Sequence, residues 1–488
     1  MINNSKMQIV SGFQWSFLDT LFNSGTSFFV GVILARILSP REFGIIGLIT
    51  IIVSISNSLI DSGFSQALIR KKSVSEHEYT SVFFFNLFVS FFLYLLLYAF
   101  TPNIAHFFHQ PVLKKVIPVL CSVILVNALG IIQRTILIRN IDFRTQTIIS
   151  IISVSISSCT SIVLAILGYG VWSLVFLTLV RQFLQLICLW VSSKWKPKAV
   201  FSFSHISVLF NFGWKLLIAG LIETVYKEIY SAIIGKNYSA YTVGFYVKAQ
   251  QFNSIFSNAF AMVIQKVSYP YFSRIEHDET QLNYYFKRIF RFAMIFSFIL
   301  NFLIFSISDS IIKILLGNIW MESAQYLRIL CFAGALYPLH ILNLNLLNVK
   351  GRSDFFLMLE IIKKIIAIPI VIIGIHTNIK ILLYGVVLNS FISVFINSVL
   401  TGKYVKFSTK EQVKSILFFY IISVGIGAIV YNIQFILNVH IIYLFVIQIM
   451  IYTLLTILIY FIFIRKDFYD IVSMLCFFIN RIRGRYNV

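Results

Sequence analysis

Long apolar stretches follow one another along almost the whole chain, and they constrain the fold more than any other feature. Each is about 20 residues or longer, the length that crosses the hydrocarbon core of a bilayer as a helix. Short connections separate them, and no soluble domain interrupts the series. We identify about fourteen, at roughly residues 10–36, 43–69, 79–101, 113–138, 145–168, 171–193, 207–234, 241–267, 286–308, 323–348, 355–375, 379–402, 414–433 and 440–464.

The composition indicates the same class of protein. Of the 488 residues, 59% are hydrophobic and only 12% are charged, whereas a soluble domain carries about 25% charged residues. We therefore expect an all-α polytopic membrane protein. The first stretch has no small-residue cleavage site after it, so it reads as a retained span rather than a signal peptide. The five cysteines form no CxxC pair, and we expect no disulfide framework and no metal site.

Lysine and arginine are concentrated in every second connection between the predicted spans. Of the 40 Lys and Arg residues, 26 lie in one alternate set of connections and ends, and seven lie in the other set. The positive-inside rule then places both termini in the cytoplasm, which an even number of spans also requires. We expect a multi-pass protein of the bacterial inner (cytoplasmic) membrane. Most of the net charge of +22 thus reflects topology, and no basic stripe interleaved with aromatic residues predicts a nucleic-acid partner.

Two parts of the sequence resemble each other at a distance of about 200 residues. Phe13-Gln14-Trp15 opens the first span and Phe212-Gly213-Trp214 opens the seventh; Ser39 to Gly47 (SPREFGIIG) and Ser239 to Tyr246 (SAYTVGFY) follow about thirty residues later. Such repeats are typical of transporters that rock about a central site, although short aromatic motifs can also coincide in a Phe-rich chain. We predict two pseudo-symmetric six-helix bundles around a central cavity (1–200 and 201–405), two additional transmembrane helices (406–466) and a cytoplasmic amphipathic basic tail (467–488).

Polar residues form stripes on four of the repeat-related spans. Residues three and four apart share one helix face, and a polar face inside a membrane must meet protein or water. The stripes are Asp19, Asn23 and Thr26 in the first span; Ser54, Asn57 and Asp61 in the second; Glu223, Lys227 and Tyr230 in the seventh, with Glu228 turned away; and Lys248, Gln251, Ser254 and Asn258 in the eighth. We infer that the four spans line one cavity.

The charges in these stripes predict two roles. Lysine binds phosphate as a point charge, so Lys227 and Lys248 are candidates for binding an anionic substrate, with Gln251, Asn258 and Tyr230 beside them and Arg181 deep in the sixth span. Carboxylates at membrane depth suit coupling to H⁺ or Na⁺, and the candidates are Asp19, Asp61, Glu223 and Glu228. No other cofactor is expected.

Simpler interpretations of some of these residues stay open. Glu223 and Lys227 stand four residues apart and can neutralise each other. Asp19 can bond to Gln14 or Trp15. Lys363 lies close enough to the cytoplasmic interface for its ammonium group to reach it.

The residues from Leu34 to Lys72 (LARILSPREFGIIGLITIIVSISNSLIDSGFSQALIRKK) resemble the start of polysaccharide-transport proteins. These are the O-antigen, capsule and teichuronic-acid flippase-like members of the multidrug/oligosaccharidyl-lipid/polysaccharide exporter superfamily. Val243 to Phe252 (VGFYVKAQQF) resembles a second motif of this family, in which a basic residue matches Lys248. The resemblance implies fourteen spans and the translocation of undecaprenyl-diphosphate-linked oligosaccharide by alternating access. It also implies that Lys227 and Lys248 act on the diphosphate.

The expected function is therefore that of a flippase and not of an enzyme. Its expected partners are the lipid-linked oligosaccharide, membrane lipids, and a polysaccharide polymerase with its chain-length machinery; we expect a monomer. One alternative is a cation-coupled multidrug antiporter, which a cavity with more acids than bases would favour. Another is a membrane-embedded polysaccharide polymerase or ligase, which needs a sizeable outer loop with catalytic arginines, and no connection here is long enough.

Overall fold

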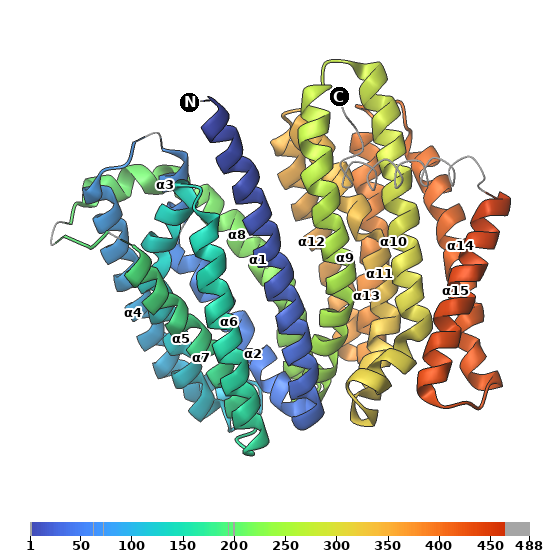
Figure 1. Cartoon of the computed structure of the whole chain (residues 1–488), viewed down its shortest axis with the longest axis horizontal. Helices are drawn as coiled ribbons and strands as arrows, with labels where there is room; N and C mark the ends of the chain where they lie inside the picture. Colours follow the sequence, from blue (N-terminus) through green and yellow to red (C-terminus); the bar gives the residue numbers. More distant parts are fainter. Residues whose placement is uncertain (1, 62, 72, 194, 199–200, 464–488) are drawn as a thin grey trace. The chain divides into compact units, whose positions relative to one another are not determined.

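The computed structural model describes residues 2–61, 63–71, 73–193, 195–198 and 201–463, and regular secondary structure within these ranges is helical (Figure 1). The predicted tail at 467–488 lies outside the described residues. The helices are α1 (Ile2–Ile37), α2 (Pro40–Asp61), α3 (Phe64–Arg70), α4 (Glu76–Phe107), α5 (Leu113–Arg139), α6 (Phe143–Ile166), α7 (Val171–Ser192), α8 (Phe203–Asn237), α9 (Ala240–Arg274), α10 (Glu279–Leu315), η1 (Asn318–Trp320), α11 (Met321–Val349), α12 (Ser353–His376), α13 (Ile379–Thr401), α14 (Thr409–Ile436) and α15 (Ile441–Phe463).

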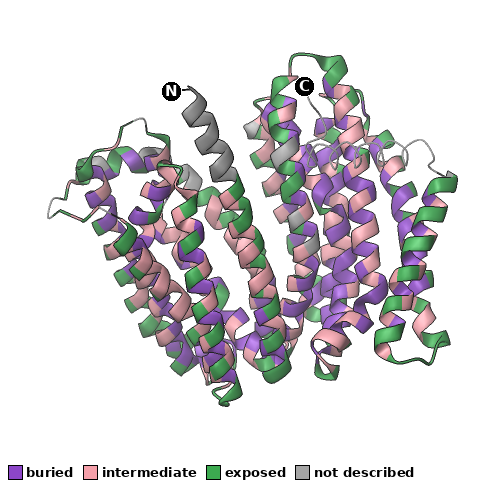
Figure 2. Ribbon diagram, in the orientation of Figure 1, coloured by how far each residue is buried: buried purple, intermediate pink, exposed green. Residues whose placement is uncertain are grey.

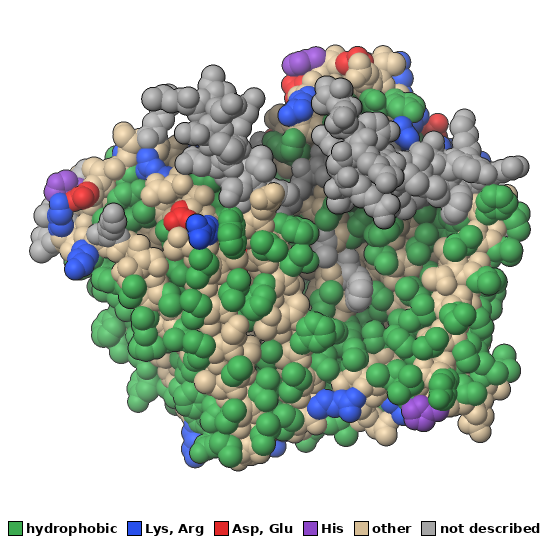
Figure 3. All heavy atoms as spheres, in the orientation of Figure 1, with side chains coloured by type: hydrophobic (Ala, Val, Ile, Leu, Met, Phe, Trp, Pro, Cys, Tyr) green, Lys and Arg blue, Asp and Glu red, His purple; other side chains and the backbone are tan. Residues whose placement is uncertain are grey.

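The helices have the lengths and surfaces of membrane spans. Among the described residues, eleven helices are long and apolar enough to cross a bilayer, which confirms the prediction of an all-α polytopic membrane protein. Helices α8, α9 and α12 are at least as long as the shortest of these eleven, and the count of fourteen stays a prediction. On the face drawn in Figure 3, hydrophobic side chains cover the middle of each unit and charged ones lie toward the helix ends, as expected of a surface in contact with lipid.

Local sequence signals explain where several helices begin. Capping boxes start α4 at Ser75 and Glu78, and α14 at Ser408 and Glu411. In each box, the serine oxygen accepts a bond from the backbone of the third residue, whose own side chain accepts one in return. Gly168 and Gly170, with φ of 82° and 55°, form the tight turn between α6 and α7.

The apolar stretch predicted at 43–69 is divided into two helices. Helix α2 ends at Asp61, and α3 begins at Phe64 after Gly63, whose φ is +71°. The left-handed conformation of this glycine interrupts the helix at low cost. A carboxylate oxygen of Asp61 accepts bonds from the backbone nitrogen and the hydroxyl of Ser65. Asp61 thus lies at a helix end, where it caps the next helix, and not inside a continuous span.

The first compact unit comprises Met1–Val247. In it α1 packs on α6, α4 on α5, α6 on α7, and α2 on α8. Helix α6 fits closely between its neighbours because its buried face carries the small residues Ser150, Ser153, Ser157 and Ser161, a composition that brings membrane helices together. These contacts group α8 with the helices before it. The boundary between two repeats at 200/201 stays a prediction.

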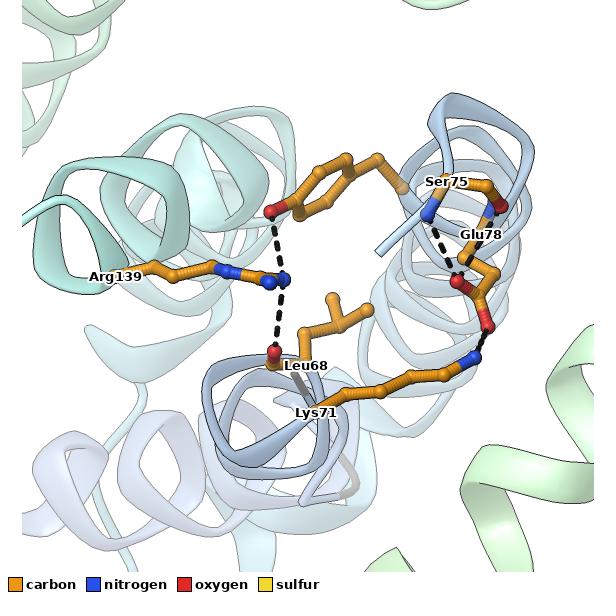
Figure 4. A network of polar contacts seen from close by, with 6 residues as sticks. Leu68, Lys71, Ser75, Glu78 and Arg139 are labelled. Carbon is orange, nitrogen blue, oxygen red and sulfur yellow. Dashed lines mark hydrogen bonds and ion pairs between the residues drawn. The ribbon is translucent and has the colours of Figure 1, made fainter. Parts of the chain in front are cut away.

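A polar network joins α3 to α4 and α5 at one end of this unit (Figure 4). Lys71 pairs with Glu78, which is 4% exposed and also accepts a bond from the backbone nitrogen of Ser75 at 2.9 Å. Arg139 donates to the carbonyl of Leu68 at 3.3 Å and to the hydroxyl of Tyr79 at 3.4 Å. The bond from Arg139 to Leu68 ties α3 to α5, and the ion pair of Lys71 with Glu78 ties the end of α3 to α4.

The second compact unit comprises Lys248–Val488. Helix α10 lies against α11, α14 and α15, and α13 packs on both α11 and α12. Figure 2 shows buried residues along α10 and α11. Phe298 and Phe302 of α10 meet the ring of Tyr420 of α14, with centroids 5.2 and 5.1 Å apart. These edge-to-face contacts attach the first of the two C-terminal helices to the rest of the unit.

Candidate functional site

A polar cavity of about 530 Å³ lies among α1, α5, α6 and α7 of the first unit. Its lining is unusual for a membrane bundle because charged and amide side chains outnumber aliphatic ones. The lining residues are Asp19, Asn23, Arg134, Ile138, Gln146, Ile149, Ser150, Leu177, Thr178, Arg181, Gln182, Gln185 and Leu189.

Asn23 connects an acid and a base inside this cavity. Its amide nitrogen donates to the Asp19 carboxylate at 2.8 Å and approaches the Ser150 hydroxyl at 2.6 Å. Its amide oxygen accepts a bond from the Arg181 guanidinium at 2.9 Å. Two residues of the predicted sites, Asp19 and Arg181, therefore lie one side chain apart. The alternative in which Asp19 bonds to Gln14 or Trp15 has no support among the described contacts, where the partner of the Asp19 carboxylate is Asn23.

Arg134 adds a second positive charge to the same cavity. Its guanidinium donates to the Gln185 amide oxygen at 3.3 Å, and it is repelled by Arg181 and attracted by Asp61. With Arg134 and Arg181 facing one lining carboxylate, Asp19, the cavity carries an excess of positive charge. Such a site favours an anion, because guanidinium groups match the oxygens of phosphate and carboxylate in geometry as well as charge.

The two arginines lie at different depths along their helices. Arg181 is ten residues after Val171 and eleven before Ser192, which places it about 15 Å from either end of α7 at 1.5 Å per residue. Arg134 is five residues before the end of α5, or about 7.5 Å. An arginine at mid-membrane persists where it meets a polar partner or a wet cavity, and Arg181 has both.

The predicted residues of α8 lie apart from this cavity lining. Lys227 and Glu223 are both exposed, and among the described residues they form no ion pair. Tyr230 is buried, with its ring 6.2 Å from that of Tyr226, and Glu228 acts electrostatically on Tyr246. The alternative in which Glu223 neutralises Lys227 has no support in this arrangement.

Lys248 contacts the neighbour that the stripe on α9 predicted. It is 2% exposed, and its ammonium group donates to the amide oxygen of Gln251 at 3.1 Å. Asn258, further along the same stripe, is exposed. The carbonyl oxygen of Gln251 also accepts a bond from the Ser254 hydroxyl at 3.0 Å. The polar stripe of α9 is thus linked internally from Lys248 to Ser254.

Six polar residues of the cavity lining were not identified from the sequence: Arg134, Gln146, Ser150, Thr178, Gln182 and Gln185. Arg134 stands near the end of its span, where sequence alone does not distinguish a cavity residue from a residue of a basic connection. The glutamines did carry a signal. Thr178, Arg181, Gln182 and Gln185 recur at helical spacing within one span, a polar stripe of the same kind as those on the first and eighth spans.

The apolar helices and the polar cavity among α1, α5, α6 and α7 define a multi-pass membrane protein with a polar site among its spans. Comparison with known sequences identifies its family. Residues 33–325 match the family described as "Polysaccharide biosynthesis protein", and the chain belongs to this family.

Two curated relatives illustrate the similarity. The succinoglycan biosynthesis transport protein ExoT of Rhizobium meliloti (strain 1021) is 24% identical over 325 residues, which cover 66% of this chain and 66% of ExoT, just under two thirds. The teichuronic acid biosynthesis protein TuaB of Bacillus subtilis (strain 168) is 24% identical over 349 residues, which cover 71% of this chain and 72% of TuaB.

Solved structures share the fold. The lipid II flippase MurJ in an inward closed conformation superposes with a TM-score of 0.76 at 17% identity, covering 93% of this chain and 99% of MurJ. An inward-facing multidrug resistance MATE transporter superposes with a TM-score of 0.62 at 15% identity, covering 81% and 96%. The activities named for these relatives are transport and flipping, which confirms the expectation that the chain is not an enzyme.

Proposed function

We propose that this protein is a flippase that moves a polyprenyl-diphosphate-linked oligosaccharide across the bacterial cytoplasmic membrane by alternating access. The observation that carries the proposal is the pair Arg134 and Arg181 in a polar cavity within the membrane. Family membership, the names of ExoT and TuaB, and the MurJ-like fold support it.

The cavity suits a diphosphate–sugar headgroup chemically. A diphosphate carries oxygens that two guanidinium groups can bind in a bidentate manner. The amides of Gln146, Gln182 and Gln185 offer donors and acceptors for sugar hydroxyls. In this proposal Lys227 and Lys248, with Gln251, Asn258 and Tyr230, provide further contacts for the headgroup during its passage. The lipid tail stays in the bilayer, so the cavity needs to hold only the polar part.

We further propose that transport is coupled to an ion, and that Asp19, Asp61, Glu223 and Glu228 are the candidate coupling groups. Asp19 lies one side chain from Arg181, so its protonation would change the charge presented to the substrate. Replacing Asp19 and Asp61 together by Asn tests this coupling. Transport in the double variant should no longer respond to a proton or sodium gradient, and an intact response would place coupling elsewhere.

The proposed cellular setting follows from the function. The chain would act as a monomer with both termini in the cytoplasm. It would receive its substrate from glycosyltransferases on that side and deliver it to a polymerase and chain-length machinery on the other. No nucleic acid takes part.

A deletion strain tests the proposed function. Loss of the gene should remove surface polysaccharide while lipid-linked repeat units accumulate on the cytoplasmic leaflet, and a plasmid copy should restore export. Export at the normal level in the deletion strain, with no redundant transporter present, would contradict the proposal.

A cation-coupled multidrug antiporter is the second candidate, favoured by the MATE-like fold and by Asp19 in the cavity. The two functions separate in the same strain. An antiporter predicts lower tolerance of cationic drugs with normal polysaccharide, whereas the flippase predicts the reverse.

A further inference from the structure

A second polar cluster lies inside the second unit, where α11, α12 and α13 meet, and its centre is His340. The ring Nε2–H donates to the hydroxyl of Ser390 at 3.1 Å, and that hydroxyl donates to the carbonyl of Ala333 at 3.4 Å. The ring Nδ1 accepts a bond from the Asn397 amide nitrogen at 3.5 Å. Each donor in this chain has an acceptor, so the contacts define a neutral ring with its proton on Nε2.

Asn397 has an unused acceptor beside the ring. Its side chain is fully buried, and its amide oxygen has no hydrogen-bond partner. An unpartnered buried oxygen costs on the order of 1–3 kcal/mol. Rotation of the amide by half a turn would bring this oxygen to Nδ1 of His340, where it could accept a bond only if Nδ1 carried a proton.

An ion pair from α12 completes the cluster. Lys363 is 8% exposed and pairs with Glu360, and its positive charge acts on the His340 ring. The expectation that Lys363 extends to the membrane interface is therefore wrong, because Glu360, three residues earlier on the same helix, holds the ammonium group inside the protein.

Uncharged side chains contact the His340 ring from α13. In the part of the chain that the structure describes, Lys363 is the one charged side chain with an electrostatic effect on the ring. On α13 these contacts come from Ser390 and Asn397.

The cluster lies at the depth of the bilayer core. His340 is nine residues before the end of α11, and Lys363 is ten residues after the start of α12. At 1.5 Å per residue both lie about 14–15 Å in from the end that the two helices share. This is about half of the roughly 30 Å hydrocarbon thickness, where ionisable groups are costly unless they serve a function.

We propose that His340 is a proton-binding site of the transport cycle, in which Nδ1 takes a proton from hydronium and the Asn397 amide turns to accept the new N–H. An O–H bond of hydronium breaks as the Nδ1–H bond forms, the ring changes from neutral to +1, and release reverses each change. The proposal rests on the proposed transport function only in linking this proton to transport.

Lys363 links proton binding at His340 to the position of α12. In the arrangement described, a positive charge on His340 would be repelled by the ammonium group of Lys363, which is paired with Glu360. Proton binding therefore favours arrangements in which α12 carries Lys363 away from α11. By linkage, movement of α12 changes the proton affinity of His340 by the same factor.

Proton binding can be measured without transport. The protein with ¹⁵N-labelled histidine is placed in lipid nanodiscs, and the ring resonance lost in His340→Gln is followed against pH. Lys363→Met should strengthen proton binding at least about tenfold, one pH unit, Lys363→Arg should leave it unchanged, and Asn397→Leu should weaken it. An unaltered midpoint in both Lys363→Met and Asn397→Leu would overturn the proposal.

The link to transport is tested in liposomes that hold the lipid-linked oligosaccharide. An imposed pH gradient should change the transport rate several-fold in the wild type and in the control His376→Gln, whose histidine is exposed at the end of α12. His340→Gln should lose most of this response, and a full response in His340→Gln would overturn the link. Absence of transport in the wild type would instead contradict the proposed function, while the titration would still decide the proton site.

Discussion

Gly44 and Gly244 contact each other's helices reciprocally. A Cβ at Gly44 would overlap the carbonyl oxygen of Ala240, and a Cβ at Gly244 would overlap the carbonyl oxygen of Pro40. The same Cβ at Gly44 would stand 3.1 Å from the backbone nitrogen of Gly244. The two glycines occupy the same place in the motifs SPREFG and SAYTVG, 200 residues apart. The starts of α2 and α9 can approach this closely only without side chains at these positions.

Alanine at either glycine should destabilise this crossing. Gly44→Ala and Gly244→Ala each force two backbones apart, and overpacking of this kind costs about 1–3 kcal/mol. The melting temperature of the purified protein should fall by a few degrees in each variant. Gly220→Ala is the matched control, because a Cβ there meets nothing within 4 Å, and the higher helix propensity of alanine should keep its melting temperature at least as high as that of the wild type. Equal losses in all three variants would contradict the assignment of the loss to the close crossing.

Transport should require Asn23, whose amide oxygen accepts a bond from Arg181. Asn23→Leu removes the amide that bonds to both Asp19 and Arg181, so each charged group loses one hydrogen bond. Surface polysaccharide should therefore fall at least tenfold at an unchanged protein level. Surface polysaccharide should also fall in Arg181→Lys, because a lysine cannot reproduce the planar fork of guanidinium donors. If Asn23→Leu exported normally, the link between Asp19 and Arg181 would have no part in transport.

The two lysines of α8 and α9 give a separate test of substrate binding. Lys227→Met and Lys248→Met keep side-chain length and remove the charge, and each should reduce surface polysaccharide strongly without reducing protein. Lys115→Met, an exposed lysine near the start of α5, serves as the control. Normal export in both Lys227→Met and Lys248→Met would remove these lysines from the proposed path.

Asp309 should stabilise the second unit by linking three helices. One carboxylate oxygen accepts from Arg328 of α11 at 3.2 Å, and from Tyr431 and Gln434 of α14 at 3.1 and 3.3 Å. Since Asp309 and Arg328 are only 19% and 21% exposed, Asp309→Asn should cost about 1–3 kcal/mol, measured as a lower melting temperature.

The exposed pair of Arg352 and Asp354 provides the comparison. Asp354→Asn should leave the melting temperature unchanged, because surface ion pairs contribute little. A loss as large as that of Asp309→Asn would contradict the assignment of a structural role to the buried group.

The sequence was most informative where a physical signal repeats. Spans could be read from length and apolarity, and the acid–amide pair of Asp19 and Asn23 from helical spacing. Asp61 was placed inside a span because hydropathy runs on past Gly63, whereas the left-handed turn that ends the helix depends on one residue. Glu78 stands in a polar stretch that precedes an apolar one, where sequence alone favours exposure, but its capping box and its ion pair with Lys71 accompany its burial.

Partners on other helices could not be read in this way. Nothing local distinguishes Arg134, which enters the cavity, from Arg139, which bonds to α3. The difference lies in a rotation about the helix axis and in which helices pack alongside. The same holds for Lys363, whose partner is local but whose burial is decided by α11 and α13.

Transport in a purified system tests the central claim most directly. The protein is reconstituted into liposomes with a fluorescent polyprenyl-diphosphate oligosaccharide, and accessibility of the sugar to an external lectin or reductant is followed with time. We predict that the wild type exchanges the lipid between leaflets and that the Arg134→Gln, Arg181→Gln double variant, folded to the same melting temperature, is at least tenfold slower. Equal rates in the two proteins, or a wild-type rate no faster than empty liposomes, would contradict the account.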